Sequence, residues 1–211
     1  MPQEFGMSDF DPQSDPLLGR SCLSYQLQFC LPAAARVALA EISSQLARSV
    51  PSGLWLAPVD TLHVTCSSLI SPREDWHDKD QFWSRISSLV EESVRQVELR
   101  IPTFRLHFNI LRATDRAIIA LAEHNPCVDR ARAIVARLVP TPEARPQPQP
   151  DTIHASLCRY SEAAMLPKDL CNLVAVHQPD IWAEIDTLQL VRETAYPSLQ
   201  VETMMSVSLA R

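Results

Sequence analysis

The chain has 211 residues, of which 46% are hydrophobic and 21% are charged, which is enough for one globular domain or for two small lobes that share a core. The formal net charge of −6 argues against a protein that holds long nucleic acid through its phosphates, although a small phosphorylated ligand or an RNA end stays compatible. The six cysteines form no Cys-x-x-Cys pair, which argues against a zinc ribbon or a redox motif and favours a reducing, cytoplasmic location.

Residues 1–20 are polar and lack hydrophobic periodicity, so we expect a mobile tail that is followed by one domain over residues 21–211. We expect neither a signal peptide nor a membrane span. The first half of the domain is predicted to contain strands at Ser24–Leu31, Leu54–Ala57, Leu62–Ile70, Val97–Leu111 and Ala117–Ala122, and helices at Ala33–Val50, Trp76–Gln96 and Asn125–Leu138.

The second half begins with the proline-rich stretch Pro140–Pro150, which is predicted to be a semi-rigid connection. The elements expected after it are a strand at Asp151–Arg159, a loop with a short helix at Ser161–Leu173, and strands at Ile181–Arg192 and Val201–Leu209 with a turn at Tyr196–Ser198 between them. The order of elements is roughly duplicated. It predicts an α+β (α/β-type) bilobal fold, in which two pseudo-symmetric lobes with antiparallel sheets surround a central cleft and the helices lie outside.

Two short segments, Leu62–Cys66 and Ile153–Leu157, share the pattern apolar, His, small apolar, Thr or Ser, apolar. Side chains alternate between the two faces of a strand. One segment therefore carries His63 and Thr65 on one face, and the other carries His154 and Ser156. Two such strands placed side by side offer a base, an acid and neutral donors for phosphoryl oxygens, which is what cleavage of a phosphodiester requires.

A single His-x-Thr match is weak evidence, because a histidine on a half-buried strand is more often structural. The pair is stronger, since both motifs have apolar alternate positions, lie on predicted strands and occupy equivalent places in the two halves. A metal site is not indicated, because His63 and His154 lack the third ligand that zinc prefers. No resident cofactor is expected.

The two motifs and the order of elements resemble the 2H (two-histidine) phosphoesterase superfamily, and within it the 2'-5' RNA ligase-like proteins and the RNA 2',3'-cyclic phosphodiesterases. Three further segments carry the resemblance: Arg159 five residues after the second histidine, the proline–phenylalanine strand at Ile101–Leu106, and Leu188–Glu193 followed by Tyr196. The run Cys66–Ile70 departs from the Leu-x-Phe-Leu-Gly that usually follows the first motif.

The resemblance implies a metal-independent phosphodiesterase that acts on a 2',3'-cyclic nucleotide, a cyclic-phosphate RNA end or a related small phosphodiester. The residues alone leave open which histidine is the base. The resemblance implies that His63 protonates the leaving group and His154 activates water. Paired histidines predict a bell-shaped pH profile between apparent pKa values of about 5.5 and 8.

We expect the substrate-binding residues to include Arg159, as a charge for the phosphate, and Tyr25, Trp55 and Tyr196, as surfaces for base stacking. A surface salt bridge for Arg159 and core packing for the aromatic residues are the competing interpretations. A non-catalytic module that binds a nucleotide or an RNA end, suggested by the altered Cys66–Ile70 run, is the alternative function, and a third is an interaction protein in which both histidines are structural. We expect a monomer.

Overall fold

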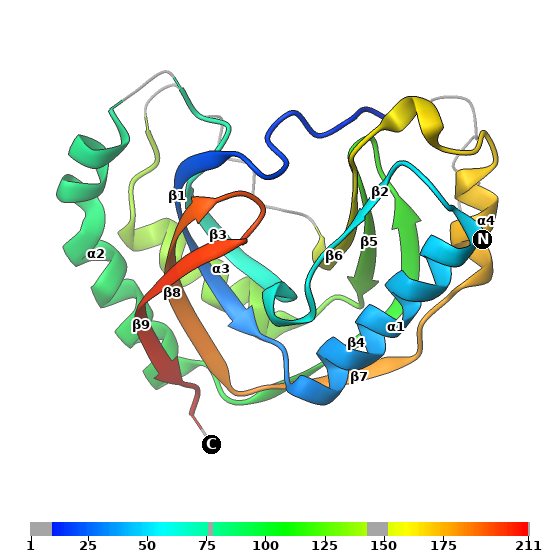
Figure 1. Ribbon diagram of the computed structural model, residues 1–211. Helices are drawn as coiled ribbons and strands as arrows, with labels where there is room; N and C mark the ends of the chain where they lie inside the picture. Colours follow the sequence, from blue (N-terminus) through cyan, green and yellow to red (C-terminus); the bar gives the residue numbers. More distant parts are fainter. Residues whose placement is uncertain (1–9, 76–77, 143–151, 211) are drawn as a thin grey trace.

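The computed structural model describes residues 10–75, 78–142 and 152–210, and within these ranges nine strands form two antiparallel sheets that lie side by side (Figure 1). The first sheet has the order β3-β1-β8-β9, with β1 at Ser21–Cys30, β3 at His63–Ile70, β8 at Thr187–Ala195 and β9 at Gln200–Ser208. The second sheet has the order β2-β6-β5-β4-β7, with β2 at Leu54–Leu56, β4 at Phe104–Ala113, β5 at Ala117–Ala122, β6 at Ile153–Tyr160 and β7 at Ile181–Ile185.

Helices cover the outer sides of the two sheets (Figure 1). Helix α2 (Lys79–Arg100) and helix α3 (Pro126–Leu138) pack beside the first sheet, and helix α1 (Ala33–Ser49) and helix α4 (Leu170–Val176) pack beside the second. Asp78 and Asn125 cap α2 and α3, where their side chains accept hydrogen bonds from backbone N–H groups of the first turn. Short 3₁₀ turns occupy Val59–Thr61 and Ala163–Met165.

The expected α+β fold with antiparallel sheets and outer helices is confirmed. Two element predictions were wrong. Residues 97–100 extend α2 instead of starting a strand, because Val97 continues the buried stripe of Val90 and Val94 at helical spacing. The expected strand Ile181–Arg192 is two strands, since the chain leaves the second sheet at Ile185 and enters the first at Thr187.

The N-terminal segment differs from the expected tail over residues 10–20. There the Asp15 N–H donates to the Tyr160 carbonyl at 2.8 Å, and the Gly19 N–H donates to the Tyr196 carbonyl at 2.8 Å. These two bonds connect the segment to β6 of the second sheet and to the β8–β9 turn of the first, so it crosses from one lobe to the other (Figure 1). Residues 1–9, 76–77 and 143–151, which hold the rest of the tail and most of the proline-rich connection, lie outside the described residues.

None of the helices in the described ranges is both long and apolar enough to cross a membrane.

Candidate active site

Strand alternation places the two motifs as the sequence predicts. In β3, Val64 and Cys66 are fully buried, and in β6, Ala155 and Leu157 are fully buried. The residues between them, His63 and Thr65 in β3 and His154 and Ser156 in β6, are only partly covered and lie on the opposite face. Because β3 contacts β6 although the strands belong to different sheets, these two faces meet.

The meeting faces enclose a cavity of about 140 Å³, which we call the catalytic cavity. It brings together seven of the eight residues predicted for the site: His63, Thr65, His154, Ser156, Arg159, Trp55 and Tyr196. Trp55 reaches the cavity because it pairs with Arg159 across the β2–β6 ladder. The remaining lining residues, which the sequence analysis did not select, are Gln26, Ala57, Thr61, Pro72, Glu193, Pro197 and Ser198.

Tyr25, the eighth residue, lies elsewhere, which corrects the prediction that it stacks on a base. Its ring is 3% exposed and stacks on Trp83 of α2, with 3.9 Å between the ring centroids. On β1 it shares the buried face of Leu27 and Phe29, and its neighbour Gln26 is the residue that reaches the cavity.

His63 is oriented by a hydrogen bond to the backbone just before β3. Its Nδ1 lies 2.7 Å from the carbonyl oxygen of Thr61, so the ring donates there and its Nε2 accepts. The side-chain nitrogen of Gln26 lies 3.4 Å from that Nε2. Burial lowers the pKa of His63, opposed by the bond to Thr61 and by the charge of Glu193, while the charge of Arg159 lowers it further.

His154 is in a more cationic setting. Its Nδ1 lies 3.3 Å from the Thr152 hydroxyl oxygen. Burial lowers its pKa to about 4, and the positive charges of His63, Arg159 and Arg132 act in the same direction. At neutral pH both rings of the ligand-free protein are therefore neutral, and the pKa of His154 lies below the lower value of about 5.5 that the sequence suggested.

Arg132 of α3 fastens the two motif strands to each other. Its guanidinium donates to the carbonyls of Thr65 and Cys66 in β3, at 3.2 and 3.1 Å, and to the carbonyl of Thr152 at the start of β6, at 3.1 Å. The residue is only 6% exposed. Hydrogen bonds from a charged donor are worth about 1.5–3 kcal/mol each, so this contact stabilises the approach of the two strands.

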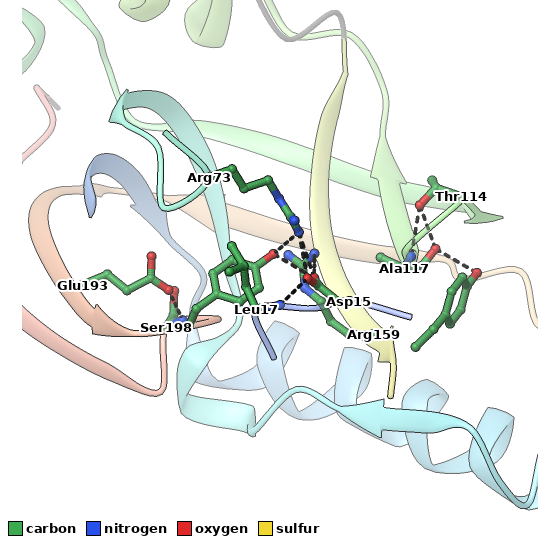
Figure 2. Close-up of polar contacts among 10 residues, drawn as sticks. Asp15, Leu17, Arg73, Thr114, Ala117, Arg159, Glu193 and Ser198 are labelled. Atoms are coloured by element: carbon green, nitrogen blue, oxygen red, sulfur yellow. Dashed lines mark hydrogen bonds and ion pairs between the residues drawn. The ribbon is translucent and has the colours of Figure 1, made fainter. Parts of the chain in front are cut away.

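Asp15 fastens the other end of the cavity (Figure 2). Its carboxylate accepts two hydrogen bonds from Arg73, each at 2.9 Å. It accepts a third from Arg159 at 3.1 Å and a fourth from the Tyr196 hydroxyl at 3.1 Å. Burial alone raises the pKa of Asp15, but the hydrogen bonds from Arg73 and from the Leu17 N–H and the charges of both arginines together hold it below its usual value. Asp15 is thus an anion that joins β6 to the first sheet.

This cluster decides what Arg159 and Tyr196 offer to a ligand. Arg159 lines the cavity while one of its nitrogens is bound to Asp15, and its Nε is buried without a hydrogen-bond partner among the described residues. The guanidinium carbons of Arg73 and Arg159 lie 5.4 and 5.0 Å from the centre of the Tyr196 ring. Two cations already occupy that ring, so base stacking on Tyr196 is disfavoured.

Glu193 is a buried carboxylate on the cavity wall. Its Oε2 accepts from the Ser24 hydroxyl at 2.5 Å. Its Oε1 accepts from the Ser198 N–H (Figure 2). The residue is 3% exposed, and its charge opposes the loss of a proton from His63. In the described ranges no group of three or more His, Cys, Asp or Glu side chains is placed to hold a metal ion.

Asp15, Arg73, Arg132 and Glu193 were not predicted as site residues, and the first three belong to no local pattern in the sequence. Asp15 lies in the segment that we expected to be a mobile tail. Arg132 lies in a predicted helix, at a position that looks like any polar position of a helix. Arg132 and its partner Cys66 are 66 residues apart in the sequence, and Asp15 and its partner Arg159 are 144 residues apart. The one local signal was Glu193, which stands within the segment Leu188–Glu193 that carried the resemblance.

Comparisons with known proteins agree with this geometry. No protein-family model matches the chain, and no curated protein matches it. Solved structures do match. TT0787 of Thermus thermophilus has a TM-score of 0.63 and 18% identity, over 88% of this chain and 97% of that one. E. coli LigT complexed with phosphate has a TM-score of 0.57 and 15% identity, over 90% and 99%.

The chain has the fold of TT0787 and of LigT. A third match is the conserved protein of unknown function ATU0111 from Agrobacterium tumefaciens, with a TM-score of 0.60, 13% identity and coverage of 97% of this chain and 93% of that one. LigT has also been solved with 3'-AMP, ATP and NADP+.

The depressed histidine pKa values predict that acid destabilises the protein. Between pH 6.5 and about 4 an unfolded histidine binds a proton that His154 in the fold does not, so the free energy of unfolding falls as pH falls through this window. We expect urea unfolding at pH 7 and pH 5 to show this loss, and His154→Gln to reduce it. His177→Gln, at a histidine outside the cavity, is the control; an equal reduction in both variants contradicts the assignment.

Removing the charge of Asp15 is predicted to destabilise the fold. Asp15→Asn leaves Arg73 and Arg159 without their shared counter-ion, and the expected cost is about 2–3 kcal/mol, less than for a fully buried pair because both arginines keep contact with water. Asp11→Asn changes an exposed aspartate of the same segment and is the control. Equal stability of the two variants in urea unfolding contradicts a fastening role for Asp15.

Proposed function

We propose that the protein is a metal-independent phosphodiesterase in which His63 and His154 act as general acid and general base on one phosphoryl group. The observation that carries the proposal is that two His-x-Thr/Ser strands from different sheets meet on one small cavity beside an arginine. An imidazole pair supplies both proton transfers of the reaction, and two hydroxyls and a guanidinium supply donors for the phosphoryl oxygens.

The electrostatic surroundings support a division of roles. His154 faces two arginines, Arg159 and Arg132, and protonation of His63 adds a third positive charge, so His154 stays neutral and suits the base that takes a proton from water. His63 has the buried carboxylate of Glu193 acting to retain its proton, so it suits the acid that protonates the leaving oxygen. Water oxygen bonds to phosphorus as the bond to the leaving oxygen breaks, and the proton taken by His154 balances the one given by His63. An anionic substrate raises both pKa values, which charges His63 for the step.

Thr65 and Ser156 lie two positions after the histidines and are assigned to the non-bridging oxygens. Arg159 contributes charge at the same group, held in place by Asp15. The proposed substrates are a 2',3'-cyclic nucleotide, a cyclic-phosphate RNA end or a related small phosphodiester. LigT, which is 15–16% identical to this chain, has been solved with phosphate and with 3'-AMP, and these complexes support a phosphorylated nucleoside as the ligand class.

The two histidines are predicted to act together, so that loss of either one removes most of the activity. His63→Ala and His154→Ala should each lower kcat by about 10²–10⁴. The double variant should lose far less than the product of the two losses. Thr65→Ala and Ser156→Ala should each lose about 10- to 100-fold, because each removes one neutral donor. His177→Ala is the matched control, and full activity in His154→Ala at an unchanged melting temperature would falsify the mechanism.

Hydrolysis is predicted to survive chelation, because imidazole groups carry both proton transfers. The measurement is a screen of 2',3'-cyclic nucleotides, cyclic-phosphate RNA ends and 2'-5'-linked oligonucleotides in excess EDTA. Turnover that EDTA abolishes and Zn²⁺ or Mn²⁺ restores contradicts the mechanism. Binding of these compounds without turnover of any of them favours instead the alternative of a nucleotide-binding module.

A further inference from the structure

A second cavity, of about 290 Å³, lies beside the catalytic cavity at the start of β6. The two cavities have no lining residue in common, but two residues of the second are direct neighbours of His154, which lines the first. Thr152 lines the second cavity, and its hydroxyl oxygen lies 3.3 Å from Nδ1 of His154. Leu121 of β5 also lines it and pairs with His154 across the β5–β6 ladder. A ligand held at His154 therefore has this cavity next to it.

The chemistry of the second cavity differs from that of the catalytic one. Its wall carries two carboxylates, Glu123 and Asp129. The first accepts from the side-chain nitrogen of Asn109 at 2.8 Å, and the second lies 2.5 Å from Nε2 of His124. Two arginines, Arg112 and Arg132, also line the cavity, and the guanidinium of Arg132 is directed to three backbone carbonyls. Carboxylates repel a phosphate and accept hydrogen bonds from hydroxyl and amino groups.

Apolar side chains complete the wall. Ile110 of β4 and Leu121 of β5 face each other across the ladder between those strands, and Ile110 is 47% exposed although it is a large hydrophobic residue. Their surface suits a flat heterocycle. The volume is about twice that of the catalytic cavity and lies near the lower end of the range for ligand pockets, roughly 300–1,000 Å³.

We propose that the second cavity binds the neutral nucleoside of a nucleotide whose phosphate lies between His63 and His154. The base lies against Ile110 and Leu121, and its amino group or the ribose hydroxyls donate to the carboxylates. This inference rests on the proposed function and extends it by assigning a direction. The nucleoside points from the histidines towards α3, away from Trp55, which stands at the Arg159 end of β6.

The test compares two probes on the full-length protein by calorimetry: adenosine 3'-monophosphate and inorganic phosphate. Ile110→Asp places a charge where the base lies, and Glu123→Gln keeps the shape of the side chain but weakens its acceptor. We expect the Kd of the nucleotide to rise at least about 10-fold in the first variant and about 3- to 10-fold in the second. The Kd of phosphate should stay constant in both.

Val37→Asp is the matched control, since Val37 is 49% exposed on α1 and lines neither cavity. Unchanged nucleotide affinity in both cavity variants overturns the inference, and a rise in Kd on Trp55→Ala then places the base at the other end of the site. Equal weakening of nucleotide and phosphate also overturns it. Turnover of 2',3'-cyclic AMP is measured in parallel, because binding without turnover counts against the proposed function and leaves the nucleoside site standing.

Discussion

The site depends on one long-range contact, the approach of β3 in the first sheet to β6 in the second. Neither strand alone carries more than one imidazole and one hydroxyl on its open face. Backbone ladders cannot hold the two strands together, because β3 pairs with β1 and β6 pairs with β2 and β5. Arg132 joins the strands at one end of the cavity through three carbonyls, and Asp15 joins the lobes at the other end through two arginines and a tyrosine.

Arg132 and Asp15 are both charged, and Arg132 and the Asp15 partner Arg159 also act on the histidines between them. Arg132 and Arg159 lower the pKa of His154, while Glu193 counters the loss of a proton from His63. Two arginines that hold the site together and the carboxylate of Glu193 thus make the two imidazoles unlike each other. Strand alternation makes the motifs equivalent, and the surrounding charges distinguish them. That asymmetry is what acid–base catalysis by two identical side chains requires.

The sequence predicted the features that local periodicity controls. Alternation in Leu62–Cys66 and Ile153–Leu157 identified the two histidines and two hydroxyl residues that β3 and β6 direct into the cavity, because a strand face is determined by residues two apart. Helical spacing identified α1, α2 and α3, although the end of α2 was placed too early at Gln96. The break at Asp186 was missed, since a strand that leaves one sheet and a strand that enters another look alike when a single residue separates them.

Contacts between distant segments could not be predicted in this way. Asp15 meets Arg73, Arg159 and the Tyr196 hydroxyl across separations of 58, 144 and 181 residues, and a polar N-terminal segment gives no hint of a buried carboxylate. The placement of Tyr25 failed for a related reason. An aromatic residue on a strand suits a ligand site or a core equally well, and only the position of Trp83 on α2 decides between them.

The central claim is that both histidines act on one phosphoryl group, and ring-nitrogen NMR tests it most directly. Inorganic phosphate is titrated into protein labelled with ¹⁵N at histidine, with His63→Ala and His154→Ala used for assignment. We expect the Nε2 signals of His63 and His154 to shift together with one Kd, and the pKa of each ring to rise as the anion binds. A shift confined to one ring, or two shifts with different Kd values, contradicts it.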